Sequence, residues 1–484
     1  MHARRAAGRV DGVEGQVTAL EREDIQGNVL RGYGFPFARY VFARVREAGP
    51  ARRWLAAQAD PVTTDAEWDA EPSPAYNVAI SFAGLQALGL PAHVLHSFPA
   101  DFREGMAARA DRVGDVGAAA PANWDAGMRE GEIHVLLTLT GSDEAAVARE
   151  AGRLQGELGD HGLEFTVQQP AAVLPTGREH FGFSDGFGQP AIAGVARDVV
   201  PGQGVPVRRR PWQRGRAGVV PSAADPRLAW RALAPGEFVL GYDDEDGGPP
   251  PAPLQPLGRN GTFMVWRKLE QDVPAWRAFL DDAAAATGLR GDAVAAKVIG
   301  RWPDGSPLVL RPDHPDEALG NDRARVNDFS YARDAEGLLC PRGAHVRRAN
   351  PRDALTGGAR LTARHRMLRR GMPYGDPLPP GALPDEDRRG LVFVCLQASI
   401  ERQFEIVQAR WCNDGDAFGL GRAADPIAGA WEDPPRVMFN GRPPRFASAM
   451  SAFVTPRGGE YLFVPGIAAL RALADLASSA SGSG

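Results

Sequence analysis

Residues 180–190 read HFGFSDGFGQP and place one carboxylate, Asp185, between glycines in a run of aromatic and small residues. A glycine-flanked aspartate is either an ordinary turn residue or a group held at a catalytic site. Two downstream segments carry further chemistry, CPRGAHVRRANPR at 340–352 and RHRMLRRGMPYG at 364–375. The three segments together supply an acid, an imidazole and guanidinium groups, which favours the catalytic interpretation.

The length and composition are those of a globular protein with a large core. The chain has 484 residues, and single cores stop growing at about 250–300 residues, so we expect two domains or one duplicated body. Hydrophobic residues make up 44% and charged residues 24% of the chain, and the formal net charge is −5. These values argue against nucleic acid or an anionic membrane as a partner. No stretch approaches the ~18 consecutive apolar residues of a membrane span.

The cysteines and the N-terminus indicate the compartment. Cys340, Cys395 and Cys412 are too few and too scattered for a disulfide framework, which fits a reducing compartment. Arg4 and Arg5 are followed by a charged, glycine-rich stretch, where an export signal needs an apolar run. We therefore expect a cytoplasmic protein.

Two cycles of strands and helices follow one another along the chain. Short runs rich in Val, Ile, Phe and Thr predict strands in the first cycle at 39–45, 76–82, 133–141 and 165–171. A helix is expected at 142–158 with Ser142 as its N-cap. The second cycle is predicted to hold strands at 237–242, 262–269, 391–398 and 403–410, and a helix at 273–288. This mixture, without regular βαβ alternation, predicts the α+β class with antiparallel sheets.

The cycles suggest a division into a mobile N-terminal segment 1–20, a domain 21–195, a linker 196–235, a second domain 236–476 and a flexible tail 477–484. The linker is rich in Pro, Gly and Arg. Its stretch VRRRPWQRGR at 207–216 is interpreted as solvated, with a basic patch for an anionic partner as the alternative. The proline-rich loop 375–390 is expected to border a substrate entrance.

Several segments resemble the dye-decolorizing peroxidases, a family of haem enzymes. The resemblance lies in the GxxDG pattern at 182–186, the histidine in GAHVRRANPR and the arginine pair in MLRRGMPYG. It extends, in family order, to DIQGNVLRGYGF at 24–35, PGEFVLGY at 235–242, GTFMVWRKLEQDV at 261–273 and LVFVCLQASIERQFEIVQ at 391–408. It implies two ferredoxin-like halves with antiparallel β-sheets flanked by helices, and haem held in the second half. Since the chain has no CxxCH motif, non-covalent haem b is expected, one per chain.

The resemblance also implies roles for individual residues. Asp185 matches the distal aspartate that shuttles a proton, and Arg369 matches the distal arginine that stabilises negative charge on the separating peroxide oxygens. Arg370 is the competing assignment, because the two arginines are adjacent. His345 matches the iron ligand. A ligating imidazole usually donates its other nitrogen to a carboxylate or carbonyl, and the candidates here are Asp414, Asp416 and Glu405.

Further residues are expected to surround the cofactor. Arg352 matches the family's contact to a haem propionate, with Arg347 and Arg348 as alternatives. Leu391 and Phe393 alternate on a predicted strand and match a pair that lines the distal pocket. Gly186 is expected to let its loop approach the porphyrin closely.

Other features have weaker functional interpretations. His180 could bond near the haem edge, and Cys340 is a conceivable thiolate ligand, although a small buried hydrophobe is the better reading of that cysteine. The run DDED at 243–246 is interpreted as a solvated turn. Surface aromatics pass electrons in the family, and Tyr374, Trp302 and Trp411 flank the relevant segments, although packing anchors are the commoner role.

The predicted function is a peroxidase that reduces hydrogen peroxide and oxidises small organic reductants such as dyes and phenolics. The alternatives are a haem carrier, sensor or iron-releasing protein on the same fold, and a non-haem binding module. No nucleic acid or membrane partner is expected, and the resemblance leaves a homodimer open.

Overall fold

The computed structural model describes residues 19–195, 199–209, 218–430, 436–439, 445–448 and 452–476. None of the helices in these ranges is both long enough and apolar enough to cross a membrane. The predicted tail 477–484 and all but the last two residues of the predicted segment 1–20 lie outside the described residues. The domain boundaries stay predictions.

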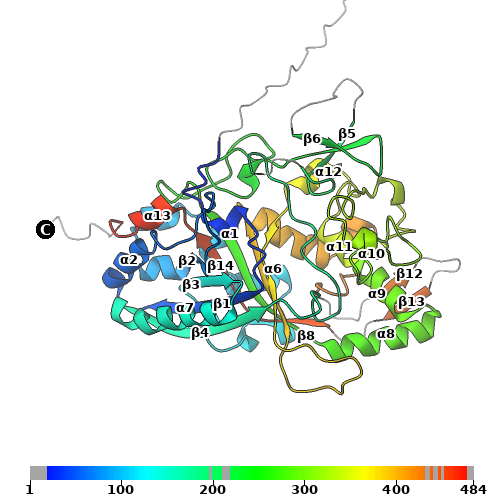
Figure 1. The fold of residues 1–484 in the computed structure, drawn as a ribbon, viewed down its shortest axis with the longest axis horizontal. Coiled ribbons are helices and arrows are strands. Elements are labelled where there is room, and N and C mark those ends of the chain that lie inside the picture. Colours follow the sequence, from blue (N-terminus) through cyan, green and yellow to red (C-terminus); the bar gives the residue numbers. More distant parts are fainter. Residues whose placement is uncertain are drawn as a thin grey trace, which may run out of the picture.

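One nine-stranded antiparallel sheet runs through the molecule (Figure 1). Its first half contains β1 (Phe37–Val45), β2 (Ala75–Ser81), β3 (Val135–Gly141) and β4 (Leu163–Ala172). Its second half contains β8 (Thr262–Gln271), β9 (Leu368–Arg369), β10 (Met372–Tyr374), β11 (Gly390–Gln397) and β14 (Val454–Val464). The strand order is β10-β11-β8-β14-β2-β3-β1-β4, with β9 paired to β11. β14 and β2 join the halves through the pairs Leu462↔Ser81 and Phe463↔Ile80.

Each half has the ferredoxin-like arrangement. The main strands lie in the order β4-β1-β3-β2 in the first half and β14-β8-β11-β10 in the second, with β9 left aside. If the four strands of each half are numbered in chain order, both halves have the order 4-1-3-2. Helices lie between the strands in a βαββαβ sequence. The predicted α+β class with two such halves is therefore confirmed.

The helices cover the sheet and the cavity described below. The α-helices are α1 (Gly27–Leu30), α2 (Ala48–Ala57), α3 (Phe82–Ala87), α4 (Ala92–His96), α5 (Ala100–Glu104), α6 (Ala110–Val113), α7 (Glu144–Glu157), α8 (Val273–Thr287), α9 (Gly291–Ile299), α10 (Glu317–Gly320), α11 (His345–Ala349), α12 (Gly358–Ala363) and α13 (Ile467–Ala472). Short 3₁₀-helices are η1 (Ala107–Arg109), η2 (Gly117–Ala119), η3 (Pro121–Asn123), η4 (Leu158–His161), η6 (Pro235–Glu237), η7 (Ala332–Asp334) and η10 (Asp416–Phe418). Two π-helical segments, η8 (Glu401–Glu405) and η9 (Val407–Cys412), follow β11.

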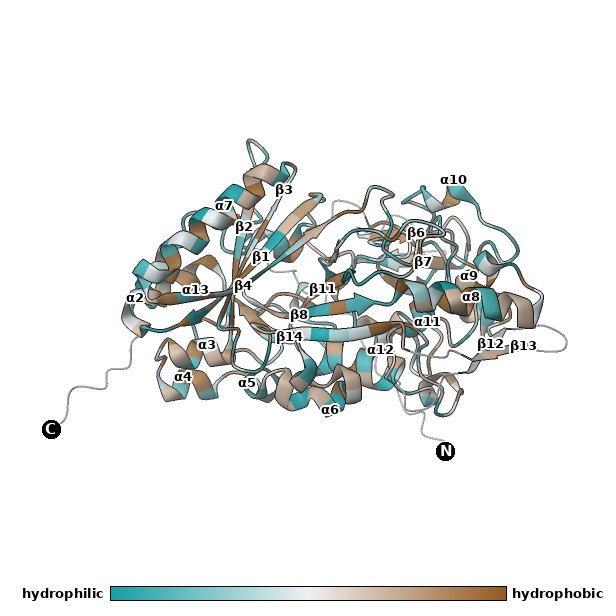
Figure 2. Cartoon of the chain, turned by 90° about the horizontal axis from the view of Figure 1, so that it is seen from below, coloured by the Kyte–Doolittle hydropathy of each residue, from teal (hydrophilic) through white to brown (hydrophobic). Residues whose placement is uncertain are grey.

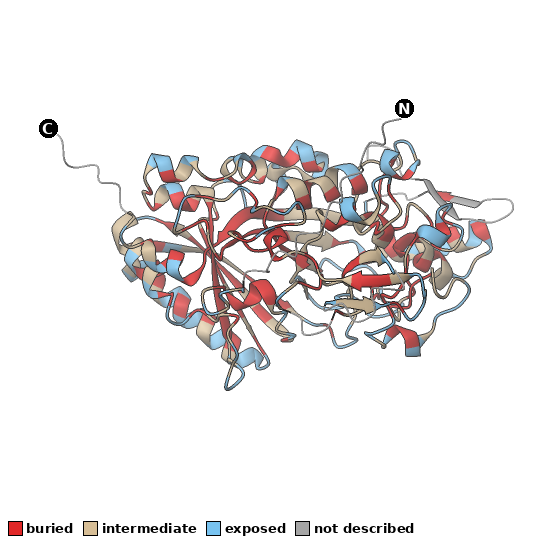
Figure 3. Cartoon of the chain, turned by 90° about the horizontal axis from the view of Figure 1, so that it is seen from above, coloured by how far each residue is buried: buried red, intermediate tan, exposed pale blue. Residues whose placement is uncertain are grey.

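The central strands are apolar on both faces because both faces are covered. Figure 3 shows the strands as mostly buried and the surrounding helices with exposed outer faces. Along β8, Phe263 and Val265 enter one hydrophobic core, whereas Met264 and Trp266 enter another. Successive strand residues point to opposite faces, so a continuous apolar run serves two cores at once. The helices are amphipathic instead, and Figure 2 shows hydrophilic and hydrophobic residues alternating along α7.

Most predicted elements are present, but two predicted strands are wrong. Residues 237–242 follow the 3₁₀-helix η6 and turn back, and the Gly236 N–H donates to the Asp243 carbonyl at 3.0 Å. A Cβ at Gly236 would lie 2.1 Å from the Tyr242 carbonyl oxygen, so this turn requires glycine. Residues 403–410 are helical, since their buried apolar residues Phe404 and Val407 are three positions apart.

Two smaller expectations also differ. The N-cap of α7 is Asp143, whose carboxylate accepts the Ala145 N–H at 2.9 Å, and not Ser142. The segment 196–235 is more than a solvated linker, because it holds β5 (Val205–Arg208), β6 (Val219–Pro221) and β7 (Leu228–Arg231) in a sheet of order β5-β7-β6. Residues 210–216 of its basic stretch lie outside the described residues. A further hairpin pairs β12 (Arg436–Phe439) with β13 (Arg445–Ser448).

Candidate active site

A cavity of about 650 Å³ lies mainly within the second half of the molecule. Its wall is formed by β8, β11, β14, the helix α11, the π-helical segments and two loops of the first half, 113–119 and 179–188. Asp185, His345, Arg352, Arg369, Leu391 and Phe393 all line it. Six of the predicted site residues are therefore brought together. Gly186, at φ +86°, is not among the lining residues, and its predicted role stays a prediction.

The imidazole of His345 is held from behind by a buried carboxylate. His345 is the first residue of α11, and its Nδ1 donates to Oδ2 of Asp425 at 2.9 Å. Burial by itself lowers the pKa of His345, but the charge and hydrogen bond of Asp425 outweigh it and raise the pKa overall. The other oxygen of Asp425 accepts the Ile427 N–H at 2.8 Å. This arrangement fixes the tautomer of His345 and leaves Nε2 as the nitrogen for a ligand.

Asp425 was not predicted as the partner of His345. The three carboxylates that were predicted for this role, Asp414, Asp416 and Glu405, are wrong. Glu405 instead pairs with Arg109, and Oδ1 of Asp414 accepts the Asp416 N–H. Asp425 lies 80 residues from His345 in the sequence. No local pattern marks it, because only the path of the chain after η9 brings it behind the imidazole.

With His345 in its predicted role as the iron ligand, we expect Asp425→Asn to weaken haem binding, because the imidazole would lose its ionised partner. Loss of such a partner typically costs about 10- to 100-fold in metal affinity. The measurement is the haem dissociation constant from titration of the apoprotein at the Soret band. Asp416→Asn changes an exposed carboxylate nearby and is the matched control. Equal affinity in the two variants would contradict the role given to Asp425.

An acid and a cation meet elsewhere in the cavity wall. Nη2 of Arg369 lies 3.7 Å from Oδ1 of Asp185, and the two side chains are 36% and 58% exposed. Oδ1 of Asp185 also accepts the Gly186 N–H at 2.6 Å, and Oδ2 has no hydrogen-bond partner among the residues that the structure describes. Arg369 is fixed through its backbone, since the Gln189 side-chain amide accepts its N–H at 3.0 Å and donates to its carbonyl at 2.9 Å.

The neighbouring Arg370 points away from this pair. Its Nε donates to the Asn28 carbonyl at 2.8 Å and its Nη2 to the Val29 carbonyl at 3.1 Å. Arg370 is not among the residues that line the cavity. Of the two adjacent arginines, only Arg369 reaches the cavity.

The loop that carries Asp185 is anchored by a second carboxylate. Glu179 accepts the N–H groups of Phe181 and Phe183, each at 2.9 Å, and the Gln271 side-chain N–H at 2.7 Å. Burial raises the pKa of Glu179 despite these donors. Glu179 stands directly before the HFGF motif and was not predicted as a site residue.

Three arginines line the cavity without a carboxylate partner among the described residues: Arg301 and Arg352, which are buried, and Arg366, which is half-buried. Arg352 donates from Nη1 to the carbonyls of Asn327 at 2.9 Å and Phe329 at 2.7 Å. Burial, together with the neighbouring guanidinium groups, lowers the pKa of Arg366 to about 9 and that of Arg301 to about 10. An excess of buried positive charge indicates an anionic ligand.

Arg347 and Arg348, the alternatives to Arg352, have structural roles. Arg347 donates to Asp334 at 3.0 Å, and Arg348 donates to backbone carbonyls that include Trp411 at 3.0 Å. Neither lines the cavity. Arg301 and Arg366 were not predicted as site residues, since an isolated arginine carries no sequence signal that it will line a cavity.

Two family models match the chain. The model described as the DyP dimeric alpha+beta barrel domain matches residues 24–169. The model described as the C-terminal part of Dyp-type peroxidases matches residues 255–431. The chain belongs to the DyP-type peroxidase family.

Relatives of this DyP-type chain match it over most of its length. It is 30% identical to a dye-decolorizing peroxidase of Exidia glandulosa over 94% of this chain and 87% of the relative. It is also 30% identical to a multifunctional dye peroxidase of Amycolatopsis sp., over 83% of this chain and 82% of the relative. The chain is also similar to a deferrochelatase of Yersinia pestis over a shorter stretch. The two are 33% identical over 127 residues, which cover 26% of this chain and 24% of that protein.

Solved structures of DyP-type peroxidases have the same fold. A fungal DyP-type peroxidase from Auricularia auricula-judae matches with a TM-score of 0.78 and 26% identity, over 95% of this chain and 100% of that chain. A dye-decolorizing peroxidase in complex with 2,6-dimethoxyphenol matches with a TM-score of 0.77 and 27% identity, over 94% of this chain and 100% of that chain. Another solved relative is described as having an engineered haem pocket.

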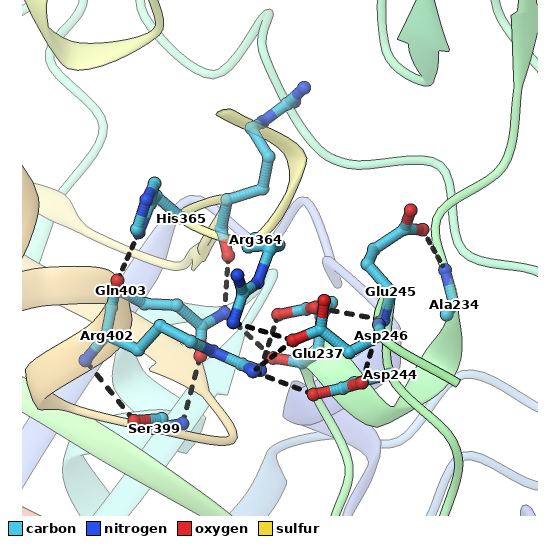
Figure 4. Close-up of polar contacts among 11 residues, drawn as sticks. Ala234, Glu237, Asp244, Glu245, Asp246, Arg364, His365, Ser399, Arg402 and Gln403 are labelled. Atoms are coloured by element: carbon cyan, nitrogen blue, oxygen red, sulfur yellow. Dashed lines mark hydrogen bonds and ion pairs between the residues drawn. The ribbon is translucent and has the colours of Figure 1, made fainter. Parts of the chain in front are cut away.

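The DyP-type site contains a second imidazole, His365, which was not predicted. His365 lines the cavity, and its Nδ1 donates to the carbonyl of Arg402. Burial lowers the pKa of His365, which favours the neutral ring, and with Nδ1 as the donor its Nε2 is an acceptor. Arg402 in turn donates to Glu237 at 2.9 Å and to Asp244 at 2.7 Å, and these contacts are drawn in Figure 4.

The run 243–246 is therefore not simply a solvated turn. Asp244 pairs with Arg402, and Glu245 is buried against Arg231 (Figure 4 shows both carboxylates). Burial raises the pKa of Glu237 to about 7, although Arg402 opposes the shift. Within the described ranges, no group of three or more His, Cys, Asp or Glu residues is arranged to hold a metal ion. This cluster supports the backbone behind His365.

The remaining candidates lie away from the cavity. His180 Nε2 bonds to the Tyr374 carbonyl at 2.9 Å and does not line the cavity. Cys340 is buried outside it, and burial raises the pKa of its thiol to about 12, which argues against a thiolate ligand. All three cysteines are free and buried. Tyr374, Trp302 and Trp411 are at most 5% exposed, so none is the surface aromatic that the family's electron transfer would need.

Proposed function

We propose that this chain is a haem-dependent peroxidase that reduces hydrogen peroxide and oxidises small organic donors such as dyes and phenolics. The observation that carries the proposal is the convergence of Asp185, Arg369 and His345 on one cavity, with the acid and the guanidinium 3.7 Å apart. The match to dye peroxidases over most of both chains supports it, as does the solved relative bound to a phenol.

The residues of the cavity fit haem b, bound non-covalently and once per chain. His345 would hold the iron through Nε2, because its Nδ1 is engaged with Asp425. The two propionates would meet the guanidinium groups of Arg352, Arg301 and Arg366, which have no carboxylate partner in the part of the chain that the structure describes. When bound, the haem supplies the redox chemistry of its iron and porphyrin. Leu391 and Phe393 would exclude water above it.

The acid and the arginine have separate tasks in this proposal. Asp185 takes a proton from one peroxide oxygen and returns it to the oxygen that leaves as water. Its Oδ2 is the atom that holds the proton, since Oδ1 is engaged by the Gly186 N–H. Arg369 stabilises the negative charge that develops as the two oxygens separate. The hydrogen bonds from Gln189 to its backbone place Arg369 without using its guanidinium.

The second candidate is a protein that carries haem or releases its iron. The match to a deferrochelatase favours it but covers only a quarter of the chain. Storage or release needs an axial ligand and no proton shuttle, so the Asp185–Arg369 pair favours the peroxidase. Location in the cytoplasm and a homodimeric state stay predictions.

One spectrum tests the proposal. The purified holoprotein is expected to show a Soret band that changes within seconds of adding one equivalent of hydrogen peroxide, and to recover when a dye is added. A Soret band that does not respond to peroxide would favour the carrier. Failure to bind haem would contradict both candidates.

A further inference from the structure

Asn327 stands between two arginines of the cavity and the loop that carries the acid. The residue lines the cavity and is 1% exposed. Its Oδ1 accepts from Nη2 of Arg301 at 2.7 Å and from Nη2 of Arg352 at 3.4 Å. Its Nδ2 donates to the carbonyl of Phe187 at 2.7 Å. Phe187 follows Asp185 by two residues, so one amide connects both guanidinium groups with the loop of the proposed proton carrier.

The surroundings of Asn327 determine which way its amide points. A guanidinium group only donates hydrogen bonds and a carbonyl only accepts them, so the oxygen faces the arginines and the nitrogen faces Phe187. A flipped amide would place N–H groups against N–H groups and oxygen against oxygen. The position therefore needs an acceptor and a donor on one short side chain. Aspartate supplies only the acceptor.

The backbone at Asn327 is itself held in place. The carboxylate of the next residue, Asp328, accepts the indole N–H of Trp230 at 2.8 Å. The backbone carbonyl of Asn327 accepts from Nη1 of Arg352 at 2.9 Å. A change in the contacts of the arginines is therefore passed on to Phe187 through the side chain of Asn327.

The loop 182–190 has two weaker contacts near Phe187. The same carbonyl accepts from Nε2 of Gln203 at the longer distance of 3.3 Å. The guanidinium carbon of Arg301 lies 5.6 Å from the centroid of the Phe187 ring, at the long end of the range for a cation–π contact. The amide of Asn327 forms the shorter of the two hydrogen bonds to this carbonyl, so we expect it to set the position of the loop.

The charges of the two arginines make this arrangement sensitive to an anion. Arg301 and Arg352 carry the same charge and share one acceptor oxygen, so they repel each other. A carboxylate that pairs with both guanidinium groups offsets this repulsion and keeps them against Oδ1 of Asn327. An anion at the arginines therefore stabilises the arrangement in which Asn327 holds Phe187. The haem propionates are the carboxylates that the proposed function assigns to these arginines.

We propose that Asn327 is a positioning residue that couples carboxylate binding at Arg301 and Arg352 to the position of the 182–190 loop. When carboxylates occupy the arginines, the loop is held and Asp185 stays beside Arg369. Without them the loop loosens. The proposal rests on the proposed function, since haem is the source of the carboxylates. It adds a link between the binding of the cofactor and the placement of the acid.

The test compares haem with haem dimethyl ester, in which both propionates are esterified and carry no charge. The apoprotein is saturated with each, and amide hydrogen exchange of the 182–190 segment is followed by mass spectrometry. We expect exchange to be about fivefold slower with haem than with the ester, which corresponds to one hydrogen bond. The porphyrin ring is the same in both, so the difference reports the carboxylates. Equal exchange would overturn the coupling.

The variant Asn327→Asp separates the two sides of the amide. Aspartate keeps an acceptor for the arginines and loses the donor to Phe187, so the difference between haem and its ester should disappear. The control is Asn77→Asp, because Asn77 is another buried asparagine with a bond on each side, from the Tyr33 hydroxyl and to the Thr63 carbonyl, each at 3.1 Å. It does not line the cavity, and its variant should keep the difference. A difference retained in Asn327→Asp would overturn the role of Asn327.

A second measurement keeps this proposal distinct from the peroxidase itself. The response of the Soret band to one equivalent of hydrogen peroxide is recorded on the same samples. A normal response together with equal loop exchange for haem and its ester would reject the coupling alone. Slower loop exchange with haem but no response to peroxide would reject the proposed peroxidase alone. An apoprotein that binds neither haem nor its ester would contradict both.

Discussion

Replacing Asp185 by asparagine is expected to slow the reaction of the holoprotein with hydrogen peroxide by about 10²- to 10⁴-fold, the usual contribution of a positioned acid–base group. Asparagine keeps the size of the side chain and the acceptor for the Gly186 N–H. It cannot take the proton from peroxide. The measurement is the second-order rate of the Soret change in stopped flow at pH 7.

The matched control for this variant is Asp376→Asn. Asp376 is another exposed aspartate beside a glycine, and it does not line the cavity. Its replacement should leave the rate of the peroxide reaction unchanged. If Asp185→Asn reacted as fast as this control, the proton would have to move through another group. The proton transfer proposed for Asp185 would then be wrong.

Replacing Arg369 by methionine is expected to slow the same reaction by about 10²- to 10³-fold, as does removal of one preorganised donor from a site of developing negative charge. Methionine keeps much of the length and the apolar contacts of the arginine stem. The haem absorbance spectrum of the resting protein should keep its intensity, because Arg369 is not among the residues proposed to hold the haem. The rate is again measured in stopped flow.

The neighbouring Arg370→Met variant provides the comparison. Arg370 bonds the backbone of Asn28 and Val29, so its loss should lower the melting temperature and leave the peroxide rate within a few-fold of the wild type. The opposite result, a slow Arg370→Met and a normal Arg369→Met, would exchange the roles of the two arginines.

The fold was predictable where the sequence pattern and the packing agree. The runs 76–82 and 262–269 are short, β-branched and aromatic, and they became β2 and β8. The run 237–242 has a similar composition, but Gly236 and the buried Glu237 turn it back on itself. Short apolar runs of this kind cannot be assigned without knowledge of their tertiary partners.

The candidate site was predictable where a motif carries the residue. Asp185, His345 and Arg369 stand in recognisable segments and meet in one cavity. Asp425 and Arg301 stand in no such segment, and their positions depend on how the chain folds between α9 and β14. Their roles follow from burial and hydrogen-bond partners, which a single sequence does not reveal.

The two hydrogen bonds from the Gln189 side chain to the backbone of Arg369 bear on how the enzyme is inactivated by heat. Gln189 follows Asp185 by four residues, so the two hydrogen bonds of its amide tie the loop of the acid directly to the strand of the cation. Because these bonds join the loop to the strand, Asp185 and Arg369 are expected to keep their relative position on heating until the two bonds break. Thermal inactivation should therefore coincide with the breaking of these two hydrogen bonds. At lower temperatures the enzyme should keep its activity.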